Sequence, residues 1–472
     1  MKTIMEVRDL SVTTSDNTTL VWPISFTLQP GIPLTLLGET GSGKSLLAQA
    51  LMGNLPSGLK ASGVVMIDGE DLMSMPENQR RSWWGRRMTM LPQEPWHALD
   101  PIMRVGAQIQ EGHQLVAGLE ASAARNAMLD DLATLGLNDS EFKLPMQLSG
   151  GMAQRAAFAA ARAGNAPIVI ADEPTKGLDS ARRDDVVRLL REALGSAGGL
   201  LTITHDMAVA EQLGGMVMIM RRGECLESGK SETVLAAPQS AYGQQLMAAN
   251  PERWPARQLP PSASADVVLD AREVSLQRGG KALFKDLSLA LHRGEILGVN
   301  GASGSGKSSL GDLLLGLIPP DSGQVLRAEG IAATRFLKLY QDPPAAFSPW
   351  WRLGTLLKDL CKLHKLSWAI IPPLMERLSL APELLERRPD SISGGELQRF
   401  SILRALMLEP VFLFADEPTS RLDPITQQQT LELLIELARE RDCALLLVSH
   451  DRALVDHACD RQISLQTSAI CV

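Results

Sequence analysis

The chain has 472 residues, which is too long for one ordinary hydrophobic core and suits two domains of typical size. Hydrophobic residues make up 45% of it and charged residues 21%, close to the averages of soluble globular proteins, so neither wholesale disorder nor a fibrous repeat is indicated. The formal charge of −8 argues against a broad electrostatic footprint for nucleic acid, and we expect no nucleic-acid partner.

The sequence shows no sign of a membrane span or of secretion. It has no run of about 18 uninterrupted apolar residues, and its opening residues, MKTIMEVRDL, contain no apolar segment of the signal-peptide type. We therefore expect the chain to be made and kept in the cytosol. Its five cysteines lie far apart without metal-ligand spacing, so reduced thiols are favoured over a redox or metal site assembled in the fold.

The chain consists of two similar halves. In chain order, the first half begins MEVRDLSV and continues as LVWPISFTLQPGIPLTLLGETGSGKS; the second begins LDAREVSL and continues as ALFKDLSLALHRGEILGVNGASGSGKS. Each half predicts short alternating strands, a turn at Pro30-Gly31 or Arg293-Gly294, an apolar strand, and a glycine loop that opens a helix. This order of strand, loop and helix is the context that a phosphate-binding loop requires.

Further segments recur in the same order after the two glycine loops. They are LPQEP and LYQDP, LSGGMAQR and ISGGELQR, IVIADEPTKGLD and FLFADEPTSRLD, and LLTITHD and LLLVSHD. From Ser149 to Asp172 and from Ser393 to Asp416 the separation is 23 residues, which makes coincidence implausible. From the loop lysine to the glutamine the separation is 49 residues in the first half and 34 in the second. The second half therefore lacks part of the region SGVVMIDGEDLMSMPENQRRSWWGRR.

The duplication defines the expected domains. We predict a first domain over residues 1–249, an interdomain linker over 250–265 and a second domain over 266–472. The linker region, NPERWPARQLPPSASAD, is rich in Pro, Ala and Ser and has no helical or strand period. Its Pro-Pro pair favours an extended, semi-rigid course.

Both halves resemble the ATPase domain of ABC transporters, and the resemblance covers nearly the whole chain. A glycine loop alone indicates only some P-loop protein, whereas LSGGMAQR or ISGGELQR before an apolar strand that ends in Asp-Glu is far more discriminating. The resemblance implies an α/β fold with two tandem P-loop ATPase domains, each with a RecA-like core, an antiparallel β subdomain and a helical subdomain. Singly, the motifs could be a tight turn, a helix N-cap or a solvated strand end; their ordered recurrence favours function.

The glycine loops are the predicted ATP sites. Their backbone N–H groups would wrap the β-phosphate at a helix N-terminus, and Lys44 and Lys307 would neutralise the β and γ phosphates. The predicted ATP-binding residues of the loops are Gly38, Glu39, Thr40, Gly41, Ser42, Gly43, Lys44 and Ser45, with Gly301, Ala302, Ser303, Gly304, Ser305, Gly306, Lys307 and Ser308.

The predicted metal and catalytic residues come from both halves. The expected Mg²⁺ ligands are Ser45, Gln93 and Asp172, and Ser308, Gln341 and Asp416. The glutamates directly after the aspartates would polarise the attacking water, and the histidines that end later apolar strands would approach the γ-phosphate. In the family, the glutamines lie on the loop that senses the membrane partner. The predicted catalytic residues are Glu173, Glu417, His205, His450, Gln93 and Gln341.

The LSGG-type segments explain why the chain carries two halves. Each opens a helix whose N-terminus forms a second anion site, and in the family this site serves the nucleotide of the other domain. The predicted ATP-binding residues here are Ser149, Gly150, Gly151, Ser393, Gly394 and Gly395, with Asp179 and Asp423 crossing the interface. Lys44 would then face Ser393, and Lys307 would face Ser149. Fusion makes the pairing intramolecular, and ATP-driven closure would move membrane subunits encoded separately.

Contacts to the adenine base are less defined in this sequence. Many relatives stack the base on an aromatic residue before the phosphate loop, but SVTTSDN offers only Thr13 and Thr14, and VSLQRGG offers Arg278. Arg278 could stack through its guanidinium plane or be a surface arginine without a role.

A narrower resemblance concerns the transported substrate. LPQEPWHALDPIMRVGAQI is similar to the glutamine-loop region of dipeptide, oligopeptide and nickel importer ATPases, and YQDPPAAFSPWWRLGTLL is a more divergent version. APQSAYGQQLMAANP matches their His-Pro-Tyr segment only at Pro238, Tyr242 and Leu246. Their cysteine-bearing extension is absent, so no iron–sulfur cluster is expected. The pairs Trp83-Trp84 and Trp350-Trp351 could contact membrane subunits, although packing explains tryptophan equally well.

These resemblances imply the ATP-hydrolysing subunit of an importer for peptides, nickel or metal–opine chelates, with ATP and Mg²⁺ as cofactors. The expected partners are two permease subunits and a periplasmic or lipid-anchored substrate-binding protein, and the expected location is the cytoplasmic face of the inner membrane. The alternatives are a soluble twin ATPase acting on ribosomes or DNA, which the short Pro-rich linker and negative charge disfavour, an exporter, or a component of carbon–phosphorus uptake or processing.

Overall fold

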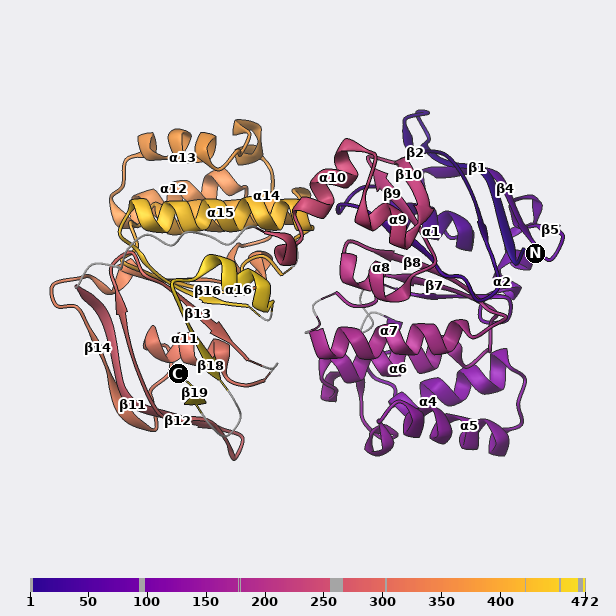
Figure 1. The fold of residues 1–472 in the computed structure, drawn as a ribbon, viewed down its shortest axis with the longest axis horizontal. Coiled ribbons are helices and arrows are strands. Elements are labelled where there is room, and N and C mark those ends of the chain that lie inside the picture. The colour runs from indigo at the N-terminus through magenta and orange to yellow at the C-terminus, as the bar shows by residue number, and fades with distance from the viewer. Residues whose placement is uncertain are drawn as a thin grey trace. The chain divides into compact units, whose positions relative to one another are not determined.

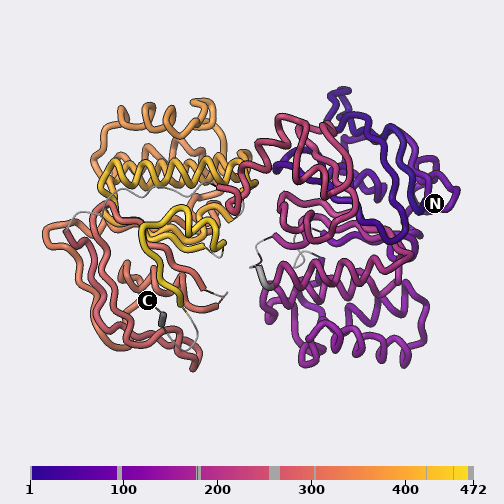
Figure 2. Tube along the Cα trace, viewed as in Figure 1, coloured from indigo at the N-terminus to yellow at the C-terminus, as the bar shows by residue number. Residues whose placement is uncertain are grey.

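The chain forms two compact units, Met1–Ala248 and Ala249–Val472. They are seen in a computed structural model that describes residues 3–92, 98–176, 178, 180–254, 266–301, 304–420, 422–449, 451–465 and 470–471. Figure 1 and Figure 2 draw the first unit from indigo to magenta and the second up to yellow. The division falls beside the predicted end of the first domain at residue 249.

The first unit opens with an antiparallel sheet in the order β2-β1-β4-β5. Its strands are β1 (Met5–Thr14), β2 (Thr19–Leu28), β4 (Leu59–Ile67) and β5 (Glu70–Asp71). In β1 the side chains of Met5 and Val7 are buried and the residue between them is not, the period-two pattern of a strand with one covered face. This sheet is the predicted antiparallel β subdomain.

A six-stranded sheet forms the centre of the first unit, in the order β10-β9-β3-β8-β7-β6. Its strands are β3 (Leu34–Leu37), β6 (Met88–Leu91), β7 (Ile168–Asp172), β8 (Gly199–Thr204), β9 (Met216–Arg221) and β10 (Glu224–Lys230). All neighbours pair in parallel except β9 and β10. Every residue of β3, β7 and β8 is buried, as expected for strands with covered faces.

Helices lie around this sheet, and those in the chain segment that connects β6 to β7 form a separate layer. They are α1 (Lys44–Met52), α2 (Glu77–Ser82), α4 (Val105–Glu111), α5 (Ala121–Thr134), α6 (Gly150–Arg162), α7 (Ser180–Leu194), α8 (Met207–Leu213), α9 (Ser231–Ala236) and α10 (Ala241–Ala248). Figure 1 shows α4, α5 and α6 grouped together away from the β1–β4 sheet. This group is the helical subdomain, and its core includes Ile109, Met128 and Phe158.

The second unit repeats the plan with fewer strands. A sheet β12-β11-β14 accompanies a sheet β15-β16-β17-β13-β18-β19. The strands are β11 (Val267–Arg278), β12 (Lys281–His292), β13 (Ile296–Asn300), β14 (Ser322–Arg327), β15 (Phe336–Leu339), β16 (Phe412–Asp416), β17 (Ala444–Val448), β18 (Arg461–Leu465) and β19 (Ile470–Cys471). The helices are α11 (Lys307–Leu314), α12 (Leu353–His364), α13 (Ile371–Arg377), α14 (Gly394–Leu406), α15 (Pro424–Glu440) and α16 (Arg452–Ala458). The predicted α/β class with two such domains is confirmed.

The shorter spacing in the second half has a structural counterpart. Between β4 and β6 the first unit contains β5, a 3-10 turn at Leu72–Ser74 and α2. Between β14 and β15 the second unit contains only a 3-10 turn at Ala333–Arg335. The missing residues therefore correspond to a strand and a helix at the edge of the antiparallel sheet.

Part of the predicted linker belongs to the second unit. After a 3-10 turn at Pro251–Arg253, the Trp254 ring packs edge-on against His457 of α16, with 4.8 Å between ring centroids. Residues 255–265 of the predicted linker lie outside the described residues. Within the described part of the chain, no helix is long and apolar enough to cross a membrane.

Candidate ATP-hydrolysis sites

The first glycine loop joins β3 to α1 and wraps around the Lys44 ammonium. Lys44 Nζ donates to Gly38 O (2.7 Å), Glu39 O (2.8 Å) and Ser42 Oγ (3.0 Å). Gly43 precedes α1 with φ 93°, a left-handed conformation that glycine adopts without steric cost. The amides at the start of α1 have no side-chain cap, so this helix N-terminus can receive an anion.

The second glycine loop joins β13 to α11 in the same way. Lys307 Nζ donates to Gly301 O at 2.7 Å, and Gly306 precedes the helix with φ 99° and no side-chain cap. Ser305 Oγ is buried without a partner among the described residues. The predicted residues Ala302 and Ser303 lie outside the described residues. The loop therefore presents a lysine and an uncapped helix start, as the first loop does.

Two aspartates end the strands next to these loops. Burial raises the pKa of Asp172 to about 6, against a hydrogen bond from Ser45 that lowers it, and Asp172 Oδ1 is buried without a partner among the described residues. In the second unit, Ser308 Oγ donates to Asp416 Oδ1 at 3.1 Å, and burial again raises the pKa of the aspartate. In each unit, a serine hydroxyl beside a buried carboxylate is an all-oxygen donor set that suits Mg²⁺.

Glu173 follows the first aspartate and is paired with His205. His205 Nδ1 lies 2.9 Å from Glu173 Oε1 and 2.8 Å from Oε2. Burial opposes ionisation of both groups, but their mutual attraction and hydrogen bond outweigh it, so the pKa of Glu173 is lowered and the pKa of His205 is raised. At the ends of β7 and β8, each of these two groups thus favours the charged form of the other.

The corresponding glutamate of the second unit meets the predicted glutamine. Gln341 Nε2 donates to Glu417 Oε2 at 2.8 Å. Both glutamates have positive φ, 47° at Glu173 and 45° at Glu417, and both amides donate to the neighbouring strand, to Ile203 O and Val448 O. A left-handed backbone at a non-glycine residue is strained. The two predicted catalytic glutamates share this conformation and the backbone bond to the next strand.

The LSGG-type serines are exposed helix caps. Ser149 caps α6 by accepting the Met152 amide (3.4 Å), and Ser393 caps α14 by accepting the Glu396 amide (3.3 Å). Gly150 and Gly394, the first residues of these helices, are exposed, whereas Gly151 is buried and Gly395 half-buried. Each unit therefore carries an outward-facing helix N-terminus.

Several predicted residues cannot be compared with the structure. Gln93, His450 and Asp179 lie outside the described residues, so their predicted roles stay predictions. Asp423, by contrast, is buried and caps α15 through the Thr426 amide.

One charge beside the second site was missed from the sequence. Lys338 Nζ lies 2.6 Å from Asp312 Oδ1 and 3.9 Å from Asp416 Oδ2. The signal was present in the alignment of the halves, since Met90 and Gln49 hold the corresponding positions in the first half. The two aspartates that we assign to metal binding thus have different electrostatic surroundings.

The predicted aromatic contacts divide into buried and exposed groups. Trp83 is buried, and Trp84 Nε1 donates to Met52 O at 3.0 Å. Trp350 and Trp351 are 76% and 59% exposed, so only the second pair is available to another chain. Arg278 is exposed too.

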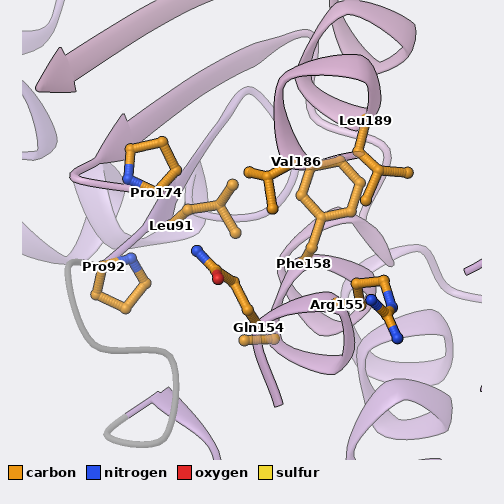
Figure 3. A pocket seen from close by; sticks show the side chains of 9 residues that line it. Leu91, Pro92, Gln154, Arg155, Phe158, Pro174, Val186 and Leu189 are labelled. Carbon is orange, nitrogen blue, oxygen red and sulfur yellow. The ribbon is translucent and has the colours of Figure 1, made fainter. Parts of the chain in front are cut away.

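A small apolar pocket of the first unit lies between the end of β6, the segment after β7, and helices α6 and α7. Figure 3 shows Leu91 and Pro92 of the segment before Gln93, Pro174 of the segment after Glu173, and Phe158 of α6 around it. Three segments that carry predicted site residues therefore meet around one apolar space.

Comparison with known proteins gives the chain its relatives. A family model described as ABC transporter matches residues 21–176 and 284–420. The peptidoglycan transport ATP-binding protein YejF of Agrobacterium fabrum is 33% identical, over 96% of this chain and 89% of that protein. The glutathione import ATP-binding protein GsiA of Escherichia coli is 33% identical, over 93% of this chain and 80% of that protein.

Solved structures with two such domains share the fold. An archaeal ribosome recycling factor, solved with the ribosomal stalk protein aP1, aligns with a TM-score of 0.66 over 96% of this chain and 87% of that chain. Its sequence is 18% identical, so the likeness concerns the fold alone.

Proposed function

We propose that this chain, which belongs to the ABC transporter family and is an ATPase subunit of such a transporter, energises the uptake of small peptides. The pairing of a glycine loop with a buried aspartate and a strained glutamate, present in both units, carries the proposal of two hydrolysis sites. The names of the peptidoglycan and glutathione transport relatives support a peptide-like cargo over nickel or metal–opine chelates.

ATP would bind at the two glycine loops. The phosphates would take the place of the loop carbonyls as partners of Lys44 and Lys307, and the uncapped amides of α1 and α11 would donate to them. Ser45 with Asp172, and Ser308 with Asp416, would hold Mg²⁺. When bound, the ion would neutralise charge on the β and γ phosphates.

Hydrolysis would use the glutamates as bases. The lowered pKa of Glu173 keeps it ionised at neutral pH, so it can orient a water molecule and accept its proton. His205, held by the same carboxylate, would orient toward the γ-phosphate. Glu417 would act in the same way once Gln341 shifts from its carboxylate.

The exposed caps of α6 and α14 support completion of each site by the other unit. Neither Ser149 nor Ser393 lies in the glycine loop of its own unit, and both helix N-termini face outward. We propose that ATP binding closes the two units head to tail and that hydrolysis opens them. This cycle would drive two permease subunits at the cytoplasmic face of the inner membrane, supplied by a substrate-binding protein.

Reconstitution of the chain with its permeases in liposomes tests this function. ATP-dependent uptake of a labelled tripeptide is expected, and it should be lost with Glu173→Gln and Glu417→Gln together. Labelled Ni²⁺ provides the competing cargo. Uptake of Ni²⁺ without peptide uptake would refute the proposed peptide cargo. Co-purification of the chain with ribosomes in place of permeases would refute the proposed role in transport.

A further inference from the structure

We infer that Tyr242, outside every recurring motif, is a positioning residue that sets the orientation of the first phosphate loop and thereby its affinity for nucleotide. The inference rests on the proposed function of Gly38–Ser45 as a phosphate loop. The backbone N–H of Glu39 donates to the Tyr242 hydroxyl at 2.8 Å, across 203 residues of sequence. Tyr242 is 2% exposed, so water does not compete for this bond.

The hydrogen bond to Tyr242 fixes the N–H of the Gly38–Glu39 peptide group, and the carbonyl of the same peptide group accepts a hydrogen bond from Lys44. The peptide between Gly38 and Glu39 contributes the carbonyl that accepts Lys44 Nζ at 2.7 Å and the N–H that donates to Tyr242. A peptide group is planar, so the phenol that fixes the N–H also fixes the direction of the carbonyl. Tyr242 therefore acts on Lys44 through the backbone.

Arg221 adds a second contact from the same side. Its guanidinium carbon lies 4.7 Å from the centroid of the Tyr242 ring, and its Nε lies 3.6 Å from Glu39 Oε1. The turn that follows Arg221 also reaches the loop, because the Gly223 amide donates to Ser42 O at 2.9 Å. The loop is thus held from this side through the Glu39 amide and the Ser42 carbonyl, and of these two contacts the first depends on the Tyr242 hydroxyl.

Helix α10 presents Tyr242 from a fixed position. The Glu227 carboxylate accepts the amides of Gln239 and Ser240, each at 2.9 Å, and the Ser240 hydroxyl at 2.8 Å. A Cβ at Gly243 would lie 2.9 Å from Pro238 Cβ and 3.1 Å from Ile219 Cδ1, so the helix packs directly on the chain beside it. A tyrosine on such a support holds the loop in place before nucleotide arrives, which lowers the ordering cost of binding.

Isolation of the first site provides the test. In a Lys307→Ala background, which removes the second site, Tyr242→Phe should weaken binding of the fluorescent nucleotide mant-ADP with Mg²⁺ roughly two- to tenfold. Binding would then have to order the released loop, at a cost limited by the free energy of one buried neutral hydrogen bond. In a Lys44→Ala background, Tyr242→Phe should change nothing. The melting temperature without nucleotide reports whether the ring still packs.

The other tyrosine of the chain is the matched control. The sequence contains two tyrosines, and Tyr340 lies in the second unit, so Tyr340→Phe in the Lys307→Ala background should leave the affinity for mant-ADP unchanged. If Tyr242→Phe binds mant-ADP as tightly as its Lys307→Ala parent, the positioning role is overturned. If Lys44→Ala and Lys307→Ala each leave both sites intact, the proposed phosphate loops fail first, and this role fails with them.

Fluorine NMR gives an independent measurement on unsubstituted Tyr242. Incorporation of 3-fluorotyrosine yields two resonances, which Tyr340→Phe assigns. Addition of Mg²⁺ and ADP to the Lys307→Ala protein should shift the Tyr242 resonance, because Lys44 leaves the Gly38 carbonyl for the phosphates. The shift should vanish when Lys44→Ala is added. A Tyr242 resonance that does not move while nucleotide binds would contradict the inference.

Discussion

The buried carboxyl of Asp172 should make the nucleotide-free protein less stable as the pH rises. Its pKa is about 6 in the fold, against an ordinary value of 3.8, because burial disfavours the charged form and the neighbouring Glu173 adds repulsion. Between these two values the folded state binds more protons than the unfolded state, so stability falls with increasing pH. A shift of about two units corresponds to about 3 kcal/mol, of which about 2 kcal/mol is lost above pH 4.5.

The substitution Asp172→Asn removes this titration. Any fixed cost of the amide is the same at every pH, so the test is the difference in slope between the variant and the wild type. From pH 4.5 to pH 8 the first unit of the wild type should lose about 2 kcal/mol more than the variant, which corresponds to about 4–8 °C in its melting temperature.

Scanning calorimetry of the full chain in EDTA measures this slope. Asp139→Asn, at an exposed aspartate of the same unit, is the control and should follow the wild type. Addition of Mg²⁺ and ATP should stabilise the first unit of the wild type more than that of Asp172→Asn, because the substitution removes a proposed metal ligand of the first site and leaves the second site intact. Parallel pH profiles of wild type and Asp172→Asn would refute the assignment of a destabilising buried charge.

Three further outcomes are expected. Glu173→Gln with Glu417→Gln should retain nucleotide binding in equilibrium titrations but release phosphate about 10²–10⁴-fold more slowly; wild-type turnover would contradict the catalytic assignment. His205→Ala in the Glu417→Gln background should raise the pKa of Glu173, so the acid limb of the hydrolysis profile should move to higher pH. Trp350→Ala with Trp351→Ala should change the unfolding free energy by at most about 0.5 kcal/mol yet reduce co-purification with the permeases, and unaltered co-purification would remove their coupling role.

Much of each site could be predicted because its chemistry is local in sequence. The glycine loop, Lys44 and Ser45 are neighbours, and Asp172 and Glu173 end one apolar strand, so the strand order of a parallel sheet brings them together. The strain at Glu173 could not be predicted, because a positive φ at a glutamate has no signal in composition or period. This conformation accompanies the hydrogen bond from the Glu173 amide to the Ile203 carbonyl of the neighbouring strand.

Electrostatic differences between the halves required the fold. Aligned motifs make Asp172 and Asp416 look equivalent, yet Lys338 lies beside only the second, since Met90 takes its place in the first half. The pairing of Glu173 with His205 likewise depends on the adjacency of β7 and β8. The electrostatic environment of each carboxylate depends on charged residues from several strands, so no single sequence segment contains all of them.

By itself, the sequence determined the duplication, the two glycine loops and the residues predicted to perform the chemistry, because backbone conformation and phosphate recognition impose short, ordered patterns of residue types. The tertiary structure alone decided what surrounds those residues: Tyr242 on the Glu39 amide, Lys338 beside Asp416 and the burial of Asp172. These contacts join side chains far apart in the chain, and their strength depends on distance and burial, which only packing establishes.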